Sequence, residues 1–438
     1  MKKITIFLLL NLLIISKLQA QLVQKNHPPE LIFLVQKMVN NYPKLKEIQN
    51  QITLAEMRTE ITKTQAKPIV SGDVSYRYSA PAPAFSIPIP GLEQKVQIQP
   101  NSNYNASVSF QQVIYDFGRL KIGIEKSEQE KRNLQNTLGS TLSNYAYQVA
   151  NIYYNILFLN KSISIKDAEI AQIRELKDLT DKRIKDGDAL EFETLTAEVR
   201  LNNAINQKTD MQNTLQKQVV LMNSFTGIDN SNLIGKTADL SRMTVLGNSE
   251  SLVSAAKSNN PDIRNFNERI DVAMHDYELA KKFYYPNIVL SGSAGFRNGF
   301  VPNIDVLQGN YVIGVGATIP IYAGDRNKKQ IELAKISAEN YKATIEVFEN
   351  TLTKDISLQL ADIQAVTEKY KTADTQIKQA QNAFDLANVR FKNGVIKNID
   401  LTDAQTSLIV VQLQKIQYEY QIILAQLEIK RLLAEKFW

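Results

Sequence analysis

The chain carries the same local sequence twice, and this repetition restricts its fold more than any other feature. Gly187 follows Arg-Ile-Lys-Asp, and Gly394, 207 residues later, follows Arg-Phe-Lys-Asn. An acidic residue lies six positions after each glycine, Glu193 after the first and Asp400 after the second. Because such a repeat is the signature of one structural unit built twice, we expect a symmetric architecture with two similar halves.

The first twenty residues have the pattern of a secretory signal peptide. Two lysines follow Met1, a mostly apolar run covers 4–15, and the small residue Ala20 precedes the expected cleavage point. The alternative interpretation is a transmembrane anchor, but such a helix needs about 20 apolar residues and this run is shorter. We therefore predict a signal peptide over 1–20 and an exported mature chain.

Composition excludes several functional classes. The chain has no cysteine, so disulfides, thiolate catalysis and lipid anchoring at a cysteine are excluded. The net charge of +6 is not gathered into a basic block, which argues against nucleic-acid binding. The two histidines, His27 and His275, form no nucleophile–base pattern. We expect neither enzymatic activity nor a cofactor or metal site.

Two stretches without proline predict long helices. No proline occurs between Pro100 and Pro261 or after Pro320, and apolar residues in both stretches recur at steps of three and four. The narrow apolar stripe is typical of helices packed lengthwise, as in coiled coils. The expected helices cover 31–66, 120–186, 190–225, 250–283, 327–393 and 398–437. Gly187 and Gly394 are expected to close the two long helices as C-terminal caps.

Each half also contains two segments in which apolar and polar residues alternate. The expected strands cover 69–78, 104–113, 287–297 and 311–320. The first repeat then spans 21–227, an equatorial linker covers 228–249, and the second repeat spans 250–438. Segments of about ten residues with this alternation suit a transmembrane β-barrel, although a soluble antiparallel sheet with one dry face produces the same pattern.

Aromatic residues lie near both ends of these segments, as in the interfacial girdles of a membrane barrel. The expected girdle residues are Tyr76, Tyr78, Tyr104, Phe296 and Tyr311 at the turn side, and Tyr115, Tyr284, Tyr285 and Tyr322 at the other side. Four strands cannot close a barrel, and an open sheet edge is not stable in lipid. A membrane location therefore predicts a homo-oligomer. Two chains would supply eight strands, which side chains just fill, so a conducting pore favours three or more chains.

At this point the chain resembles the TolC family of outer-membrane factors. The resemblance covers nearly the whole mature chain. It rests on the duplicated element order and on the paired runs Ile114-Tyr-Asp-Phe-Gly-Arg119 and Ile321-Tyr-Ala-Gly-Asp-Arg326. It also rests on the glycine–acid motif at the two hairpin tips, which are the expected turns between helices at Gly187 and Gly394. The implied fold is mainly α with membrane β. Duplicated long helical hairpins form a periplasmic α-barrel, and four strands per chain enter a shared trimeric transmembrane β-barrel.

The resemblance also implies a location and partners. The protein would be a homotrimer in the outer membrane of a Gram-negative bacterium, in contact with outer-membrane lipid and with a large periplasmic portion. It would be the passive exit duct of a tripartite efflux or type I secretion system, docked onto a periplasmic adaptor and an inner-membrane transporter. The alternative that the residues leave open is a periplasmic coiled-coil scaffold or adaptor without a membrane barrel.

The family's periplasmic gate can be transferred to the tips residue by residue. Asp400 and Asp403 match the acids that form constricting rings, and Glu193 matches the acid of the first tip. Phe391 stands where well-known members have a tyrosine and Ile396 where they have an arginine, so the closed state must be held differently, with Lys397 as a nearby charged candidate. The alternative for Asp400 and Asp403 is ordinary helix N-terminal chemistry. The proline-rich segment 79–102 either constricts the mouth or is a surface loop without a transport role.

Overall fold

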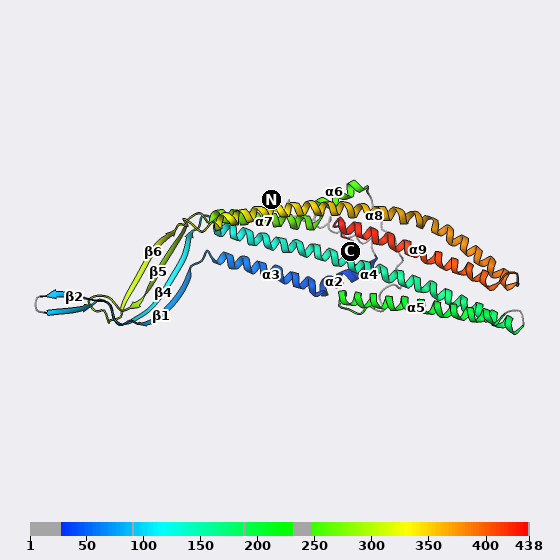
Figure 1. Cartoon of the computed structure of the whole chain (residues 1–438), viewed down its shortest axis with the longest axis horizontal. Helices are drawn as coiled ribbons and strands as arrows, with labels where there is room; N and C mark the ends of the chain where they lie inside the picture. Colours follow the sequence, from blue (N-terminus) through cyan, green and yellow to red (C-terminus); the bar gives the residue numbers. More distant parts are fainter. Residues whose placement is uncertain (1–27, 90–91, 187–189, 231–246, 437–438) are drawn as a thin grey trace, which may run out of the picture. The chain divides into compact units, whose positions relative to one another are not determined.

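The computed structural model describes residues 28–89, 92–186, 190–230 and 247–436. The predicted signal peptide, most of the predicted linker and Gly187 lie outside the described residues. The chain divides into two compact units, and each unit takes segments from both repeats. The first comprises the described residues of Met1–Gln49, Asn136–Arg264 and Ile345–Trp438, and the second those of Asn50–Gln135 and Asn265–Thr344. Figure 1 gives the order of the elements.

Both predicted opening helices are wrong as single helices. The segment expected as a helix over 31–66 contains α2 (Pro29–Asn41) and α3 (Pro43–Thr64), and the one expected over 250–283 contains α6 (Ser249–Asn259) and α7 (Pro261–Lys282). The breaks fall at Tyr42 and Asn260, whose ψ angles of 117° and 125° are extended. Each of these residues precedes a proline, which disfavours helical geometry in its predecessor and offers no N–H to the ladder.

The long helices form two hairpins. Helix α4 (Arg119–Lys185) is followed by α5 (Glu191–Thr226), and α8 (Arg326–Lys392) by α9 (Asn398–Leu432). Helices α4 and α8 each contain 67 residues. Helix α9 ends five residues before the expected position 437. Ala434 adopts φ +55° there, and the Glu435 N–H donates to the Lys430 carbonyl at 3.0 Å, which closes the helix.

One antiparallel sheet contains the four predicted strand segments. Its order is β1 (Ile69–Tyr78), β4 (Ser102–Tyr115), β5 (Asn287–Arg297) and β6 (Gln308–Thr318). Strand β6 begins three residues before the expected position 311, because Gln308 pairs with Arg297 in the β5–β6 hairpin. It ends at Thr318 rather than 320, where Pro320 cannot donate to a ladder.

A second, two-stranded sheet lies in the segment that the sequence analysis treated as a loop. Strands β2 (Ala84–Ile89) and β3 (Leu92–Gln97) pair antiparallel, with Phe85 opposite Val96. The two residues between the strands lie outside the described part of the chain. This hairpin accounts for the greater length of 79–102 relative to its counterpart 298–310.

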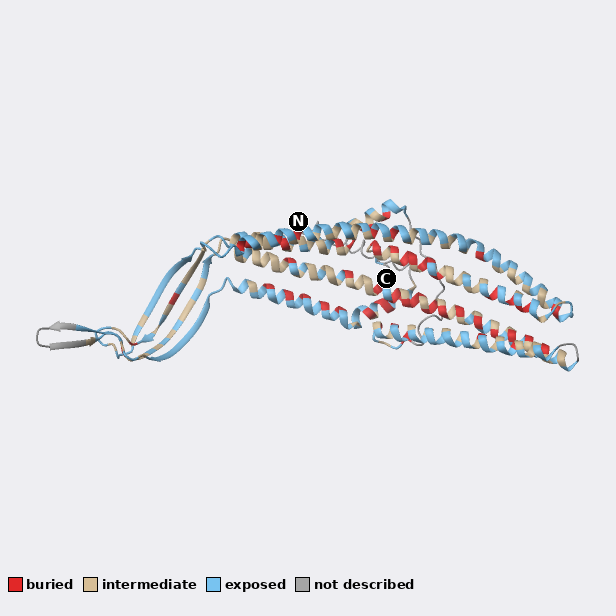
Figure 2. Cartoon of the chain, in the orientation of Figure 1, coloured by how far each residue is buried: buried red, intermediate tan, exposed pale blue. Residues whose placement is uncertain are grey.

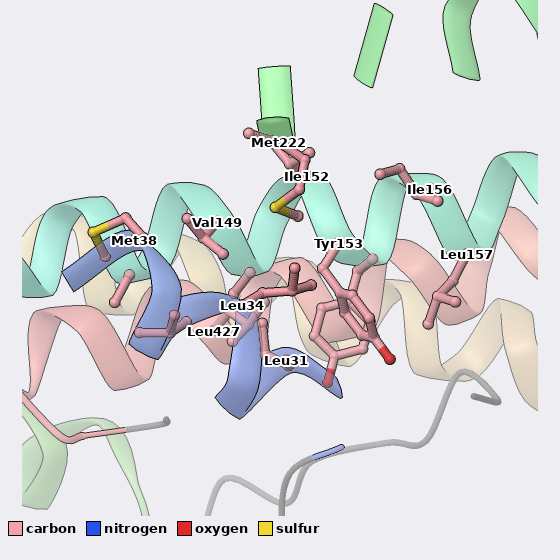
Figure 3. Packing of buried hydrophobic residues seen from close by; sticks show 14 of the residues in the cluster. Leu31, Leu34, Met38, Val149, Ile152, Tyr153, Ile156, Leu157, Met222 and Leu427 are labelled. Carbon is pink, nitrogen blue, oxygen red and sulfur yellow. The ribbon is translucent and has the colours of Figure 1, made fainter. Parts of the chain in front are cut away.

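The helical core is built twice from equivalent positions. One cluster joins α2, the start of α3, the middle of α4, the end of α5 and α9 (Figure 3). The other joins α6, α7, α8 and the end of α9. Leu34 in the first cluster corresponds to Leu252 in the second at an offset of 218, and Val149 corresponds to Ile356 at an offset of 207. The offsets differ by 11 because the 24 residues of 79–102 exceed the 13 residues of 298–310 by that number. The duplication therefore extends to the packing.

Candidate functional site

The second hairpin turns at Gly394, directly after α8. Gly394 has φ +72°, which is the left-handed conformation. Its N–H donates to the Phe391 carbonyl at 2.9 Å, and the Val395 N–H donates to the Arg390 carbonyl at 2.9 Å. These two bonds form a Schellman motif, which satisfies carbonyls at the helix end. Glycine is favoured here because it adopts positive φ without steric cost.

Phe391, the residue expected to differ from the family's lock, is buried at the junction of the two tips. It is 2% exposed and packs with Leu176 of α4 and Leu401 of α9. The Arg183 guanidinium of the first tip lies 5.1 Å from the centre of the Phe391 ring, and its Nη1 donates to the Phe391 carbonyl at 3.4 Å. Ile396, which stands where well-known members of the resembled family have an arginine, packs against the same cluster. An apolar junction with one arginine thus connects the tips within the chain.

Arg183 is not among the site residues predicted from the sequence. The signal was present, because Arg183 opens the repeated motif and corresponds to Arg390 at the offset of 207. Its role depends on a partner about two hundred residues away, which no local pattern shows.

The two predicted gating acids of the second tip have different environments. The Asp400 carboxylate accepts a hydrogen bond from the Lys397 N–H at 3.0 Å, and Asp400 lies in the first turn of α9. The helix N-terminal alternative therefore applies to Asp400. Asp403 is exposed, and within the described part of the chain its carboxylate has no hydrogen-bond or ion-pair partner. Both carboxylates are accessible to solvent, so either can line an opening.

Glu193 and Lys397, which belong to different tips, line one cavity of about 480 Å³ between α4, α5 and α9. Its wall also includes Phe192, Ile399 and Arg200. Nη1 of Arg200 is buried and has no hydrogen-bond partner among the described residues. The cavity thus brings together two of the predicted site residues and adds an arginine that the sequence analysis missed.

A polar network holds the first hairpin together across its two helices. The Thr194 hydroxyl donates to Asp181 at 2.6 Å, and Lys177 lies 3.0 Å from Asp181 and 3.3 Å from Glu198. The hydrogen bond from Thr194, followed by that from Lys177, lowers the pKa of the Asp181 carboxyl. The hydrogen bonds to Asp181 and Glu198 raise the pKa of Lys177. The network therefore favours the ionised forms of Asp181 and Lys177.

The register of the four-stranded sheet separates its side chains onto two chemically different faces. Residues directly opposite each other share a face. One face carries apolar rows such as Val74–Ala106–Phe296 and Val70–Phe110–Gly292. The other carries polar or small rows, including Ser71–Ser109–Ser293, in which the Ser71 and Ser109 hydroxyls lie 2.9 Å apart. The residues of β1 are all exposed (Figure 2), so neither face of that strand is covered by other described residues.

The five aromatic residues predicted for the turn side all lie on the apolar face. Tyr76 lies opposite Tyr104 with ring centres 5.1 Å apart, and Tyr78 follows on the same side of β1. Phe296 lies opposite Ala106, and Tyr311 lies opposite Ala294. The register thus gathers these rings at one end of the apolar face.

The four aromatics predicted for the opposite end lie near the junctions between strands and helices. Tyr115 packs edge-on against Phe117, whose ring stacks on that of Tyr285 at 5.4 Å. Tyr284 and Tyr322 are exposed. Arg119 donates to the carbonyl groups of Lys282 and Tyr285 and connects the ends of α4 and α7. These contacts explain why arginine follows the apolar-aromatic run of the first repeat.

The two outer strands of the sheet, β1 and β6, pair on one side only among the described residues. Within the described chain, no helix combines the length and the apolar character needed to cross a membrane. The same residues contain no group of three metal-ligating His, Cys, Asp or Glu side chains.

Comparisons with known proteins place these features in a family. The sequence model of the outer membrane efflux protein family matches 34–227 and 252–435, which correspond to the two repeats. The chain is 21% identical over 335 residues to the outer membrane protein TolC of Vibrio cholerae serotype O1, covering 75% of this chain and 76% of that protein. It is 23% identical over 399 residues to the outer membrane efflux protein BepC of Brucella suis biovar 1, covering 90% and 82%.

Solved structures show the same fold. The chain superposes on a structure of CusC with a TM-score of 0.78 at 14% identity, covering 94% of this chain and 93% of that one. It superposes on the outer membrane protein VceC from Vibrio cholerae with a TM-score of 0.76 at 16% identity, covering 95% and 98%. Since the family model covers most of both repeats, the chain belongs to the outer membrane efflux protein family.

Proposed function

We propose that this protein is the outer-membrane exit duct of a tripartite efflux or type I secretion system. It passively conducts substrate from a periplasmic adaptor and an inner-membrane transporter to the exterior. The observation that carries the proposal is the two-faced sheet, apolar with terminal aromatics on one side and polar on the other. A lipid-facing and water-facing sheet has this arrangement.

At least three chains are needed for the duct that we propose. Unpaired N–H and C=O groups at the edges of β1 and β6 would each cost several kcal/mol in hydrocarbon. Pairing of β1 with β6 of a neighbouring copy removes these edges, and three copies supply twelve strands. The interior of such a barrel is wider than that of eight strands, which side chains fill.

The membrane location has a matched test in β6. Val315 and Val312 are 66% and 64% exposed but lie on the apolar and polar faces, respectively. Val315→Arg should disfavour assembly in the outer membrane by about 2–4 kcal/mol, whereas Val312→Arg should be tolerated. The measurement is outer-membrane fractionation with heat-modifiable, detergent-stable trimers. A monomer that is soluble without detergent would instead support a periplasmic scaffold.

For the gate, we propose that the tips line the periplasmic entrance. Asp400 and Asp403 would each form a ring of three carboxylates there, with Glu193, Phe391 and Lys397 shaping the closed state. Like charges crowded in a narrow mouth attract cations and repel anions. Replacing both aspartates by alanine should lower cation selectivity and divalent-cation block in single-channel recordings. Unchanged selectivity would leave Asp400 with its helix N-terminal role alone.

A further inference from the structure

Charged side chains on the polar face of the four-stranded sheet occur only toward its turn end, the end at which β1 connects to β4 and β5 connects to β6. Below this end the paired rows are uncharged, as in Ser71–Ser109–Ser293. At the end, Arg77 of β1 lies opposite Asn103, and Arg297 of β5 lies opposite Asn105. Because opposite residues share a face, both arginines belong to the polar face.

The register places the two arginines on either side of β4. Their positions are separated by two strand spacings, about 10 Å across the sheet, and by two residues along it, about 7 Å. Both residues are exposed. They therefore form a pair of cations at one end of a face whose other residues, apart from Asp73, are uncharged; most are serine, asparagine or glycine, and a few are apolar, such as Val289 and Val312.

Neither arginine is neutralised by an acid within ion-pair distance in the described part of the chain. Arg297 lies 4.8 Å from the centre of the Phe300 ring, a contact that keeps its positive charge. Asp73, the one acid on this face, lies opposite Ser107, one row further from the turns than Arg297. Its carboxylate accepts a hydrogen bond from Asn105 at 2.8 Å. Asp305 belongs to the β5–β6 connection beyond the strands.

We propose that Arg77 and Arg297 form an anion-selective ring at the exit of the duct. This inference rests on the proposed function, in which the polar face surrounds the water-filled pore. Three chains would then place six guanidinium groups around one aqueous mouth. Fixed charges of one sign raise the local concentration of the opposite ion. Guanidinium groups bind carboxylate and phosphate oxygens well, so this ring would attract solutes with such anionic groups at the exit, whereas the acids proposed for the entrance attract cations.

The test measures reversal potentials of the full-length protein in planar bilayers under a KCl gradient. In about 0.1 M salt, where screening extends over about 10 Å, the combined variant Arg77→Gln/Arg297→Gln should lower the chloride-to-potassium permeability ratio about threefold or more. The matched control Arg77→Lys/Arg297→Lys keeps both charges and should keep the ratio. Asp73→Asn should change it in the opposite direction.

The outcomes separate this inference from the function on which it rests. Channels whose ratio is the same in the wild type and in the glutamine variant would overturn the arginine ring and leave the duct intact. A wild-type protein that forms no trimer and carries no current would overturn the duct and the ring together. A loss of selectivity in the lysine variant equal to that in the glutamine variant would also overturn the ring, because it would show that charge is not the cause.

Discussion

Phe391 offers a direct test of whether the tips are held together by buried apolar contact. Phe391→Ala removes a ring that is 2% exposed and packs between Leu176 and Leu401. It also removes the aromatic face beneath the Arg183 guanidinium. The backbone and the Schellman turn at Gly394 remain available, so the change acts on the junction between the tips.

The size of the effect follows from these contacts. Truncating a buried phenylalanine to alanine costs about 3–5 kcal/mol, and an exposed cation–π contact contributes about 0.5–1 kcal/mol. We take about 3 kcal/mol, the low end, because the junction lies at the tip of two hairpins. Since about 1.4 kcal/mol corresponds to a factor of ten, local opening should increase about 100-fold. Arg183→Gln, which keeps the ring buried, should increase it only about fivefold.

Hydrogen–deuterium exchange of the purified protein in detergent measures this opening directly. Peptides covering 384–401 should exchange about 100-fold faster in Phe391→Ala, while peptides from the sheet should be unchanged. Phe192→Ala is the matched control. Phe192 lies in α5 near the first tip but is 72% exposed, so its removal should change exchange no more than about twofold. Equal effects of the two variants would refute the argument that burial of Phe391 holds the junction.

Two further predictions concern the hairpin tips and α4. Gly394→Ala should destabilise the second tip by about 1 kcal/mol because alanine is strained at φ +72°, although the added Cβ meets nothing closer than 3.6 Å. Gly139→Ala, inside α4, should instead stabilise the protein. Thermal unfolding and local hydrogen exchange should show the loss of stability in the first variant and the gain in the second. The pKa of Asp181 in the folded protein lies below its ordinary value of 3.8, so the ionised carboxylate stabilises the first hairpin at pH values above 3.8. This contribution to stability is lost as the pH falls through the lower pKa of the folded state. Thr194→Val should raise that pKa, so pepsin cleavage at the first tip should begin at a higher pH than in the wild type; identical pH profiles would contradict this.

Much of the sheet could be predicted from the sequence because the side chains on its two faces differ in chemistry. Alternation over 69–78 and 287–297 coincides with β1 and β5, since one residue of slippage would move every apolar side chain to the polar face. The β2–β3 hairpin could not be predicted in this way. Pro88 argues against a strand, but both strands of an isolated hairpin are edges, where a missing N–H can face outward.

The two pairs of helices expected as single helices show where periodicity alone gives a wrong prediction. Pro43 and Pro261 carried a clear signal for a break, but apolar spacing continues on both sides of each and favours one uninterrupted helix. The structure keeps the apolar stripe and interrupts the backbone: Leu34 and Leu45 lie on different helices yet belong to the same core cluster. Periodicity reports which face is buried, whereas the proline reports where the helical hydrogen-bond ladder stops.

The two tips differ because only one member of each repeated pair lies at the junction within the chain. Arg183 and Arg390 are equivalent, as are Ile184 and Phe391, at the offset of 207. Arg183 contacts the end of α8, whereas Arg390 is exposed; Phe391 is buried, whereas Ile184 is only partly so. The duplication makes the two positions equivalent in sequence, but the packing of α4 against α8 and α9 involves only the position at the second tip. That packing buries the residue at position 391 and leaves its equivalent at 184 partly exposed. The burial of the Phe391 ring and its contact with Arg183 are therefore a consequence of that packing.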